Sequence, residues 1–174
     1  MLFHQNGLLL MPDVNFRRSC GGDAETVCRL TSAAVARLAP ETYPQEVVAT
    51  WMVGRSPADY AAACAAGEMW LAEIPEGPAG FAHAVPGELI RLFVDARCHG
   101  SGIGAGLMQR ALQDAIPAGG GTVRIDATLN AVPFYRRWGL QEQGRGCFPG
   151  RAGLPDIEVI HLAAEFPARE SAAQ

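Results

Sequence analysis

The fold of this chain is decided by one stretch of its sequence, LFVDARCHGSGIGAG at residues 92–106. An apolar segment typical of a β-strand enters a loop that holds Arg97 and alternating glycines, and a helical pattern of apolar residues follows. Glycine lets a backbone approach a ligand closely, and the first turn of a helix offers unpaired N–H groups and a dipole that favours negative charge. The stretch therefore predicts a strand, an anion-binding loop and a helix, with Arg97 adding a positive charge.

Two interpretations of the glycines compete at this point. The glycines can simply allow a helix to pack closely on a sheet, although each one costs a helix about 1 kcal/mol relative to alanine. Residues 100–105 also match the dinucleotide pattern G-x-G-x-x-A, with Asp126 placed where a ribose-binding acid would lie. Against the dinucleotide interpretation, residues 95–99 separate the strand from the first glycine, and little chain remains after Asp126. A Walker A loop is excluded because the sequence lacks G-K-[ST].

A second motif favours a third interpretation. The pattern R-x-x-G-x-G at residues 97–102 resembles the acetyl-CoA signature Q/R-x-x-G-x-G/A of the GNAT acyltransferase family. Residues 130–140, NAVPFYRRWGL, resemble that family's second block, which has an Asn, then a helix with Phe-Tyr, then Gly-Phe; Leu140 replaces the usual aromatic residue. The two motifs occur in the expected order and spacing. The resemblance covers about residues 13–162.

The resemblance implies an α/β (α+β) fold with a mixed, mostly antiparallel twisted sheet of about six or seven strands, flanked by helices and containing a central parallel strand pair. Local patterns predict strands at residues 14–19, 68–74, 80–85, 88–94, 122–127, 140–144 and 157–162. They predict helices from Asp23 to about Ala39, at 45–52 and 57–66, from the glycine loop to about Ala115, and at 131–138, the last one capped by Asn130. Alternation in the third strand of the meander places Glu88, Ile90, Leu92 and Val94 on one face and Leu89, Arg91 and Phe93 on the other.

The resemblance also implies acetyl-CoA as the co-substrate, without a metal. The backbone N–H groups from Cys98 to Gly104 would hold its pyrophosphate, and the main chain of Phe93 and Val94 would pair with its pantetheine arm like another strand. In the family the two parallel strands splay apart at this point, here around Val94 and Ile125. The expected acetyl-CoA contacts are Phe93, Val94, Arg97, Cys98, His99, Gly100, Ser101, Gly102, Ile103, Gly104 and Asn130.

Acyl transfer to an amine needs two proton movements, because the acceptor arrives as an ammonium ion and the departing thiolate takes up a proton. Tyr135 matches the family position near the thioester sulfur and is the expected general acid; a tyrosine of the core is the simpler alternative. Glu88 is the expected general base, directly or through water, with His83 as an alternative and a solvated strand end as the simpler explanation. A non-catalytic acyl-CoA sensor that keeps the same loop is an alternative function.

The acceptor is expected to be a small-molecule or peptide amine. Its pocket is expected at residues 39–55 and 144–155, because these segments flank the thioester in this architecture. Acidic side chains would attract a cationic amine, and aromatic side chains would form apolar walls. The acids are Glu41, Glu46, Glu142 and Asp156, and the aromatic residues are Tyr43, Trp51 and Trp70.

Composition limits the remaining possibilities. The chain has 174 residues and 49% hydrophobic residues, which fits one domain at residues 13–165 with a flexible leader at 1–12 and a flexible tail at 166–174. The net charge of −4 and the lack of basic runs argue against nucleic acid as a partner. All 14 basic residues are arginines, so a lysine nucleophile is excluded.

The cysteines and the N-terminal segment bear on location. Five cysteines lie scattered without metal-ligand spacing, and this odd number favours a reducing compartment, so we expect a cytoplasmic protein. The apolar patch at residues 8–11 is too short for a membrane span or a signal peptide, so no membrane partner is expected. The resemblance makes a homodimer an expected assembly, although no apolar stripe specifies its interface.

Overall fold

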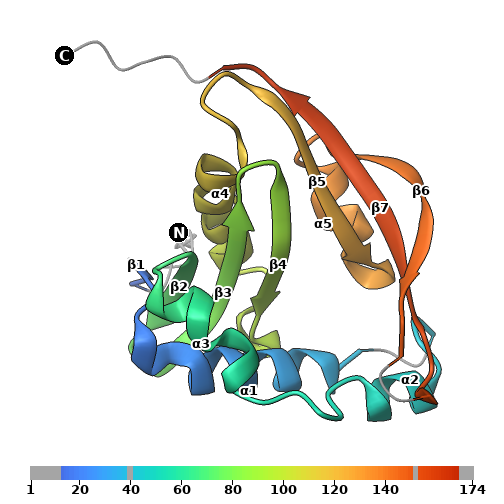
Figure 1. Ribbon diagram of the computed structural model, residues 1–174. Helices are drawn as coiled ribbons and strands as arrows, with labels where there is room; N and C mark the ends of the chain where they lie inside the picture. The colour runs from blue at the N-terminus through green and yellow to red at the C-terminus, as the bar shows by residue number, and fades with distance from the viewer. Residues whose placement is uncertain (1–12, 39–40, 151–152, 169–174) are drawn as a thin grey trace, which may run out of the picture.

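A computed structural model describes residues 13–38, 41–150 and 153–168. Its centre is a seven-stranded sheet in the order β1-β2-β3-β4-β5-β7-β6 (Figure 1). The strands are β1 (Asn15–Arg18), β2 (Met69–Ile74), β3 (Gly77–Val85), β4 (Glu88–Val94), β5 (Gly121–Thr128), β6 (Gln141–Phe148) and β7 (Ile157–Phe166). Every neighbouring pair is antiparallel except β4 and β5, which run parallel. The predicted mixed sheet with one central parallel pair is confirmed.

Helices pack on both faces of this sheet. One face carries α1 (Ala24–Val35) and α3 (Ala58–Ala65), and the other carries α4 (Ile103–Ala115) and α5 (Val132–Arg136) (Figure 1). The short helix α2 (Gln45–Thr50) packs through Val47 against the beginning of β7. The 3₁₀ turns η1 (Gly21–Asp23), η2 (Ala96–Cys98) and η3 (Leu129–Ala131) come before α1, α4 and α5, respectively.

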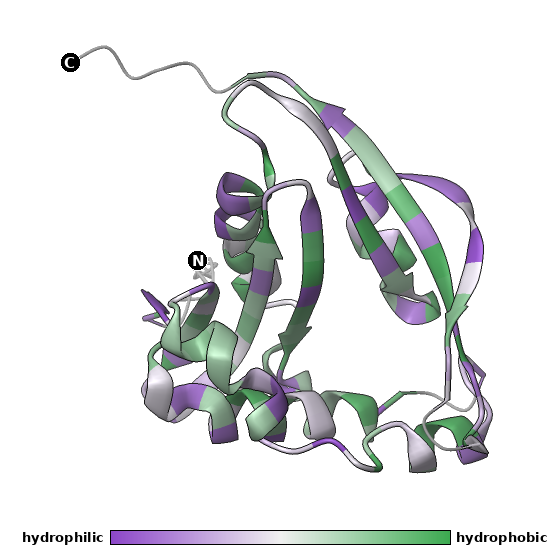
Figure 2. Ribbon diagram, viewed as in Figure 1, coloured by the Kyte–Doolittle hydropathy of each residue, from purple (hydrophilic) through white to green (hydrophobic). Residues whose placement is uncertain are grey.

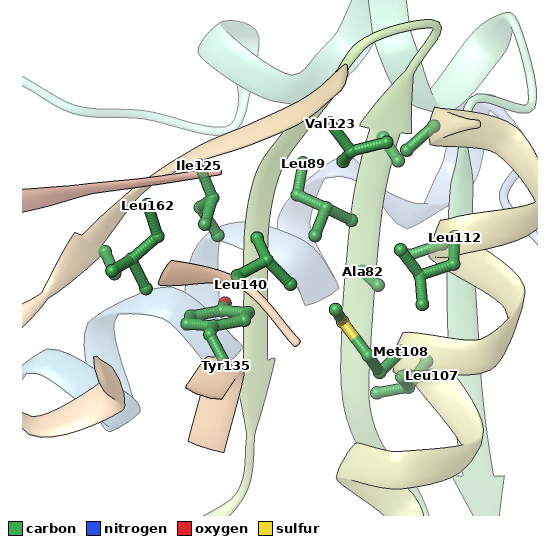
Figure 3. Packing of buried hydrophobic residues seen from close by; sticks show 14 of the residues in the cluster. Ala82, Leu89, Leu107, Met108, Leu112, Val123, Ile125, Tyr135, Leu140 and Leu162 are labelled. Carbon is green, nitrogen blue, oxygen red and sulfur yellow. The ribbon is translucent and has the colours of Figure 1, made fainter. Parts of the chain in front are cut away.

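Alternation along the strands distributes the apolar side chains over both faces of the sheet. Met108 of α4, Ile125 of β5 and Leu162 of β7 belong to one apolar cluster on one side of the sheet, which we call the α4 core (Figure 3). Tyr60 of α3 packs with Phe81 of β3 on the other side. Hydrophobic and hydrophilic residues alternate visibly along β5 (Figure 2), so its polar residues face away from the α4 core.

Some element bounds differ from the predicted ones. α1 ends at Val35, whereas the predicted end, Ala39, lies outside the described residues. β6 continues to Phe148, past the predicted end at Gly144, because an edge strand tolerates glycine where a neighbouring side chain needs the space. β7 includes Phe166, one residue of the expected tail. The expected leader at 1–12 and the rest of the tail from 169 on lie outside the described residues.

Asn130 does not cap a helix, so that prediction was wrong. The helical turn begins earlier, with Thr128 as the N-cap of η3, and Asn130 lies inside this turn. Because η3 continues directly into α5, the position that the sequence marks as a cap is already helical. The Asn130 side chain is exposed and has no hydrogen-bond partner among the described residues.

β4 contains a bulge that the sequence pattern does not reveal. His83 of β3 lies opposite Arg91, but the next residue, Ala84, lies opposite Leu89, so Ile90 is an extra residue in β4. The predicted alternation is therefore wrong at Leu89, which packs in the α4 core together with Leu92. Residues after the bulge keep a regular alternation.

β4 and β5 pair over a very short distance. The register pair between them in the described chain is Glu88 with Arg124, and the Arg124 N–H donates to the Gly87 carbonyl at 3.0 Å. Beyond this point the two strands diverge (Figure 1). The predicted splay around Val94 and Ile125 is confirmed.

A group of charges joins β1, β2 and the start of α1. Arg17 donates hydrogen bonds to both carboxylate oxygens of Asp23 at 2.8 Å and one to Glu73 at 3.0 Å. Asp23 also accepts the Cys20 N–H at 2.8 Å. Its side chain is only 10% exposed, and these bonds, chiefly those from Arg17, lower the pKa of Asp23 to about 2.

We expect Asp23→Asn to destabilise the fold by about 2 kcal/mol at neutral pH, because the depressed pKa reports a favourable ionised state. A carboxyl with a lowered folded-state pKa stabilises fully above about pH 4, and its contribution disappears as the pH falls toward about 2. Urea unfolding at several pH values measures this difference. The control Glu142→Gln breaks an exposed pair with Arg136 and should cost less than about 1 kcal/mol. Equal losses from both variants, or a loss independent of pH, would contradict the assignment.

Candidate functional site

The loop between β4 and α4 is held by its own ion pair. The Asp95 carboxylate accepts the Arg97 backbone N–H at 2.9 Å and the Arg97 guanidinium at 2.8 Å. These bonds with Arg97 lower the pKa of Asp95 to about 2. The predicted positive charge of Arg97 is therefore paired with Asp95, and its side chain, 67% exposed, closes the turn η2.

The loop leaves a set of backbone donors without partners. The N–H groups of Cys98, His99 and Ser101 donate to carbonyls within the loop. Gly100 and Gly102 have φ angles of 78° and 83°, which turn the chain into α4. The N–H groups of Gly100, Gly102, Ile103 and Gly104 have no acceptor among the described residues. They lie at the N-terminus of a 13-residue helix, where an anion is favoured.

Close packing explains another glycine of the stretch. A side chain at Gly106 would collide with the ring of Phe16 on β1. The same ring is also in contact with Arg110 of α4, whose guanidinium carbon lies 3.8 Å from the centre of the Phe16 ring. The packing interpretation is therefore right for Gly106, while Gly100 and Gly102 shape the donor loop.

A cavity of about 250 Å³ opens where β4 and β5 diverge. Its walls include β4 from Glu88 to Phe93 and the end of β5, with Tyr135 of α5 among the lining residues. Trp51, directly after α2, and Phe148, at the end of β6, also line it. The expected catalytic residues Glu88 and Tyr135 thus share one cavity with the main chain of Phe93.

Tyr135 is buried in an unusual way for a tyrosine. Its ring lies beside Leu140 in the α4 core (Figure 3), and the residue is 3% exposed. Its hydroxyl has no hydrogen-bond partner among the described residues, and burial raises its pKa well above the usual value. Tyr43 is equally buried, but its hydroxyl donates to the Glu158 carbonyl at 2.7 Å and accepts the Leu129 N–H at 3.0 Å. Tyr135 is therefore a protonated phenol whose hydroxyl is available to a ligand.

The structure separates the two expected bases. Glu88 is exposed and lines the cavity. His83 is buried and its Nε2 lies 3.2 Å from a carboxylate oxygen of Glu68, while burial lowers its pKa. Since His83 is outside the cavity lining, Glu88 is the better placed of the two.

The sequence did not reveal a third acid–base group, the pair Asp126 and His161. These residues lie opposite each other on β5 and β7, and His161 Nδ1 is 2.6 Å from Asp126 Oδ1. Asp126 lines the cavity. A side chain at Gly146 of β6 would collide with the His161 ring. Glycine inside an edge strand was the available signal, but it does not name the residue that occupies the space.

The charges around the cavity differ from the expected ones. The four acids predicted to attract the acceptor are absent from its lining; for example, Glu142 pairs with Arg136, and Asp156 accepts the Gly150 N–H. Of the predicted aromatic walls, Trp51 is present, whereas Trp70 donates to Asp114 on the α4 side at 3.0 Å. The cavity instead contains two arginines, Arg55 and Arg91.

The described part of the chain contains neither a metal-binding cluster of side chains nor a helix that could span a membrane. Within residues 13–38, 41–150 and 153–168, no three His, Cys, Asp or Glu side chains gather in a way that would hold a metal ion. In the same residues, every helix is too short or too polar to cross a membrane.

Comparisons with known proteins agree with this geometry. Residues 39–150 match the family model described as "Acetyltransferase (GNAT) domain". The Escherichia coli (strain K12) protein named "Uncharacterized N-acetyltransferase YafP" is 26% identical over 132 residues, which cover 75% of this chain and 83% of that protein.

Two solved structures show the same fold. A GCN5-related N-acetyltransferase from Rhodopseudomonas palustris, described as an aminotransferase, class II, superposes with a TM-score of 0.79 at 21% identity, covering 92% of this chain and all of that one (100%). The PaiA N-acetyltransferase of Thermoplasma acidophilum, solved in complex with coenzyme A, gives a TM-score of 0.66 at 14% identity and covers 88% and 99% of the two chains. The doubly wound sheet of the dinucleotide interpretation is excluded by the strand order.

Proposed function

The chain belongs to the GNAT acetyltransferase family, and we propose that it transfers an acetyl group from acetyl-CoA to the amine of a small-molecule or peptide acceptor. One observation carries this proposal. A loop of unpartnered backbone donors leads to a cavity that holds both a protonated phenol, Tyr135, and a carboxylate, Glu88. Direct transfer within a ternary complex needs an acid and a base in one such place.

The described residues fit acetyl-CoA as a substrate. The N–H groups of Gly100, Gly102, Ile103 and Gly104 would donate to its pyrophosphate, and Cys98, His99 and Ser101 would keep the loop in shape. Phe93 and Val94 pair with β3 on one side only, so their other edge is open to the amides of the pantetheine arm. The exposed Asn130 would add a side-chain hydrogen bond. A coenzyme A complex of a protein with this fold supports the assignment.

The proposed chemistry moves two protons. Glu88 takes a proton from the acceptor ammonium, directly or through water, and the neutral amine attacks the thioester carbonyl carbon. The carbon–nitrogen bond forms and the carbon–sulfur bond breaks. Tyr135 donates its proton to the departing thiolate, and burial keeps the phenol protonated until that moment.

A covalent acyl-enzyme is disfavoured at this site. Cys98 lies in the loop, but burial raises the pKa of its thiol, and a thiol is a far weaker nucleophile than a thiolate. His99 follows it directly and forms no side-chain hydrogen bond to it among the described residues. Direct attack by the amine therefore remains the proposed route.

The proposal also includes the cellular location of the protein, its domain organisation and its assembly. All five cysteines, at positions 20, 28, 64, 98 and 147, are free thiols, which supports the proposed cytoplasmic location. One domain at about residues 13–165 accounts for the continuous sheet. A homodimer stays a prediction of the family resemblance.

We expect Gly102→Glu to abolish coenzyme A binding in calorimetry, because a side chain and a negative charge would occupy the place of the pyrophosphate. Gly102→Ala is the matched control. It carries the same cost of a positive φ, about 1 kcal/mol, without the charge. Affinity for coenzyme A that is equal in Gly102→Glu and Gly102→Ala would show that the anion binds elsewhere.

Tyr135→Phe should lower kcat for acetyl transfer by about 10²-fold or more, while acetyl-CoA affinity and melting temperature stay near the wild-type values. Its hydroxyl has no partner to lose among the described residues, so stability should not suffer. Tyr43→Phe removes a bonded hydroxyl and should do the reverse, with a loss of about 1–3 kcal/mol in stability. Unchanged turnover in Tyr135→Phe would remove the acid from the mechanism. Acetyl-CoA binding without thiol release for any amine would instead favour a sensor.

The proposed base can be tested through pH. Glu88→Gln should lower kcat by about tenfold or more near neutral pH, and the defect should shrink at pH values where the acceptor amine is already deprotonated. A steady-state pH profile with one amine measures both effects. The wild-type profile should keep its activity on the alkaline side up to at least the ordinary tyrosine pKa, because burial raises the pKa of Tyr135. A defect of constant size at every pH would assign Glu88 another role.

A further inference from the structure

Two cationic side chains, Arg91 and Arg55, line the cavity. Arg91 projects from β4, where its guanidinium carbon lies 5.2 Å from the centre of the Tyr60 ring. Arg55 comes from the segment between α2 and α3 and lines the same cavity. Asp59 is the acid whose charge acts on Arg91 most directly, and its carboxylate also accepts the Ser56 N–H at 2.7 Å.

Two polar atoms of residues that line the cavity are buried without a hydrogen-bond partner in the described part of the chain. The Tyr60 hydroxyl and Arg55 Nε have no hydrogen-bond partner among the described residues, and Tyr60 is 1% exposed. Buried polar atoms in native proteins are nearly always hydrogen-bonded, and the exceptions require an explanation. Both residues line the cavity, so a ligand in it can supply the missing partner.

The electrostatics favour an anionic ligand group. Burial is the main cause that lowers the pKa of Arg91, and the positive charge of Arg55 acts in the same direction, whereas Tyr60 and Asp59 act in the opposite direction. A carboxylate has the geometry to accept two parallel hydrogen bonds from a guanidinium. Such a group would compensate two charges and satisfy two buried donors at once.

The same cavity also holds the negative charge that an amine needs. Glu88 lies on the same strand as Arg91, about 10 Å away along an extended chain. A volume of about 250 Å³ holds a small acceptor beside the thioester. The cavity therefore offers a small molecule one anionic contact and one cationic contact.

Resting on the proposed acetyl transfer, we propose that the acceptor is a small amino acid-like molecule, which carries a carboxylate as well as its amine. Arg91 and Arg55 bind the carboxylate together with the Tyr60 hydroxyl. Glu88 receives the amine. This assignment replaces the expectation that Glu41, Glu46, Glu142 and Asp156 attract the amine of the acceptor.

Thiol release from acetyl-CoA tests the proposal with a panel of amino acids, each paired with its own carboxamide. The wild type should prefer the acid in kcat/KM by about tenfold to a hundredfold for the best pair. Arg91→Gln and Arg55→Gln should each reduce this preference through a higher KM for the acid, and Arg91→Lys should retain part of it. An amino acid and its carboxamide differ in the pKa of the amine, and this difference affects every variant equally. The change in preference from wild type to variant therefore reports the carboxylate contact alone. Arg29→Gln, an exposed position on α1, is the control and should leave the preference unchanged.

The possible outcomes separate the two proposals. Turnover of neutral amines with no preference for the acid, or a preference unchanged in both glutamine variants, would overturn the carboxylate site and leave acetyl transfer standing. Thiol release with none of the amines would overturn acetyl transfer itself, and the inference with it. Melting temperatures and acetyl-CoA affinity of the variants show whether a loss arises from misfolding.

Discussion

The site depends on the separation of β4 from β5. These strands form a parallel pair beside Glu88 and Arg124 and diverge beyond it. The extra residue Ile90 interrupts the regular geometry of β4 just after this contact. Because a parallel sheet normally continues its ladder, the open edge of Phe93 and Val94 leaves backbone groups that a ligand can pair with. The cavity, the donor loop and the catalytic candidates all lie along this opening.

The two ends of the opening recognise ligands by different means. At the glycine loop the donors are backbone N–H groups, and the side chain of Arg97 is occupied by Asp95. At the other end, charged side chains line the cavity and buried polar atoms lack partners. Backbone donors suit a ligand that is always the same, whereas side chains can select one acceptor among many. This division explains why the loop motif is recognisable in the sequence while the acceptor side is not.

The sequence predicted the parts of the structure that local chemistry controls. The glycine loop, with a strand before it and a helix after it, follows from spacing and residue type, and the fold that the family resemblance implied is confirmed. The role of Tyr135 came from that resemblance and stays a prediction. The bulge at Ile90 could not be predicted from the sequence. In a strand with many apolar residues, the pattern looks the same with or without one extra residue. Asn130 was misplaced as a cap because a 3₁₀ turn begins before it.

Contacts between side chains of strands that are distant in the chain could not be predicted from the sequence either. His161 meets Asp126 through the register of β7 on β5, which one sequence does not reveal. Arg91 was assigned to a face but not to the cavity, since only the folded chain places it over Tyr60.

A crystal structure with acetyl-CoA would show directly whether the glycine loop and the gap between β4 and β5 bind this substrate. We expect the diphosphate oxygens to lie within hydrogen-bond distance of the N–H groups of Gly102, Ile103 and Gly104. We also expect the pantetheine arm to run along the open edge of Phe93 and Val94, with the thioester sulfur near the Tyr135 hydroxyl. An empty loop with acetyl-CoA bound elsewhere on the protein, or an arm that avoids the gap between β4 and β5, would contradict these expectations.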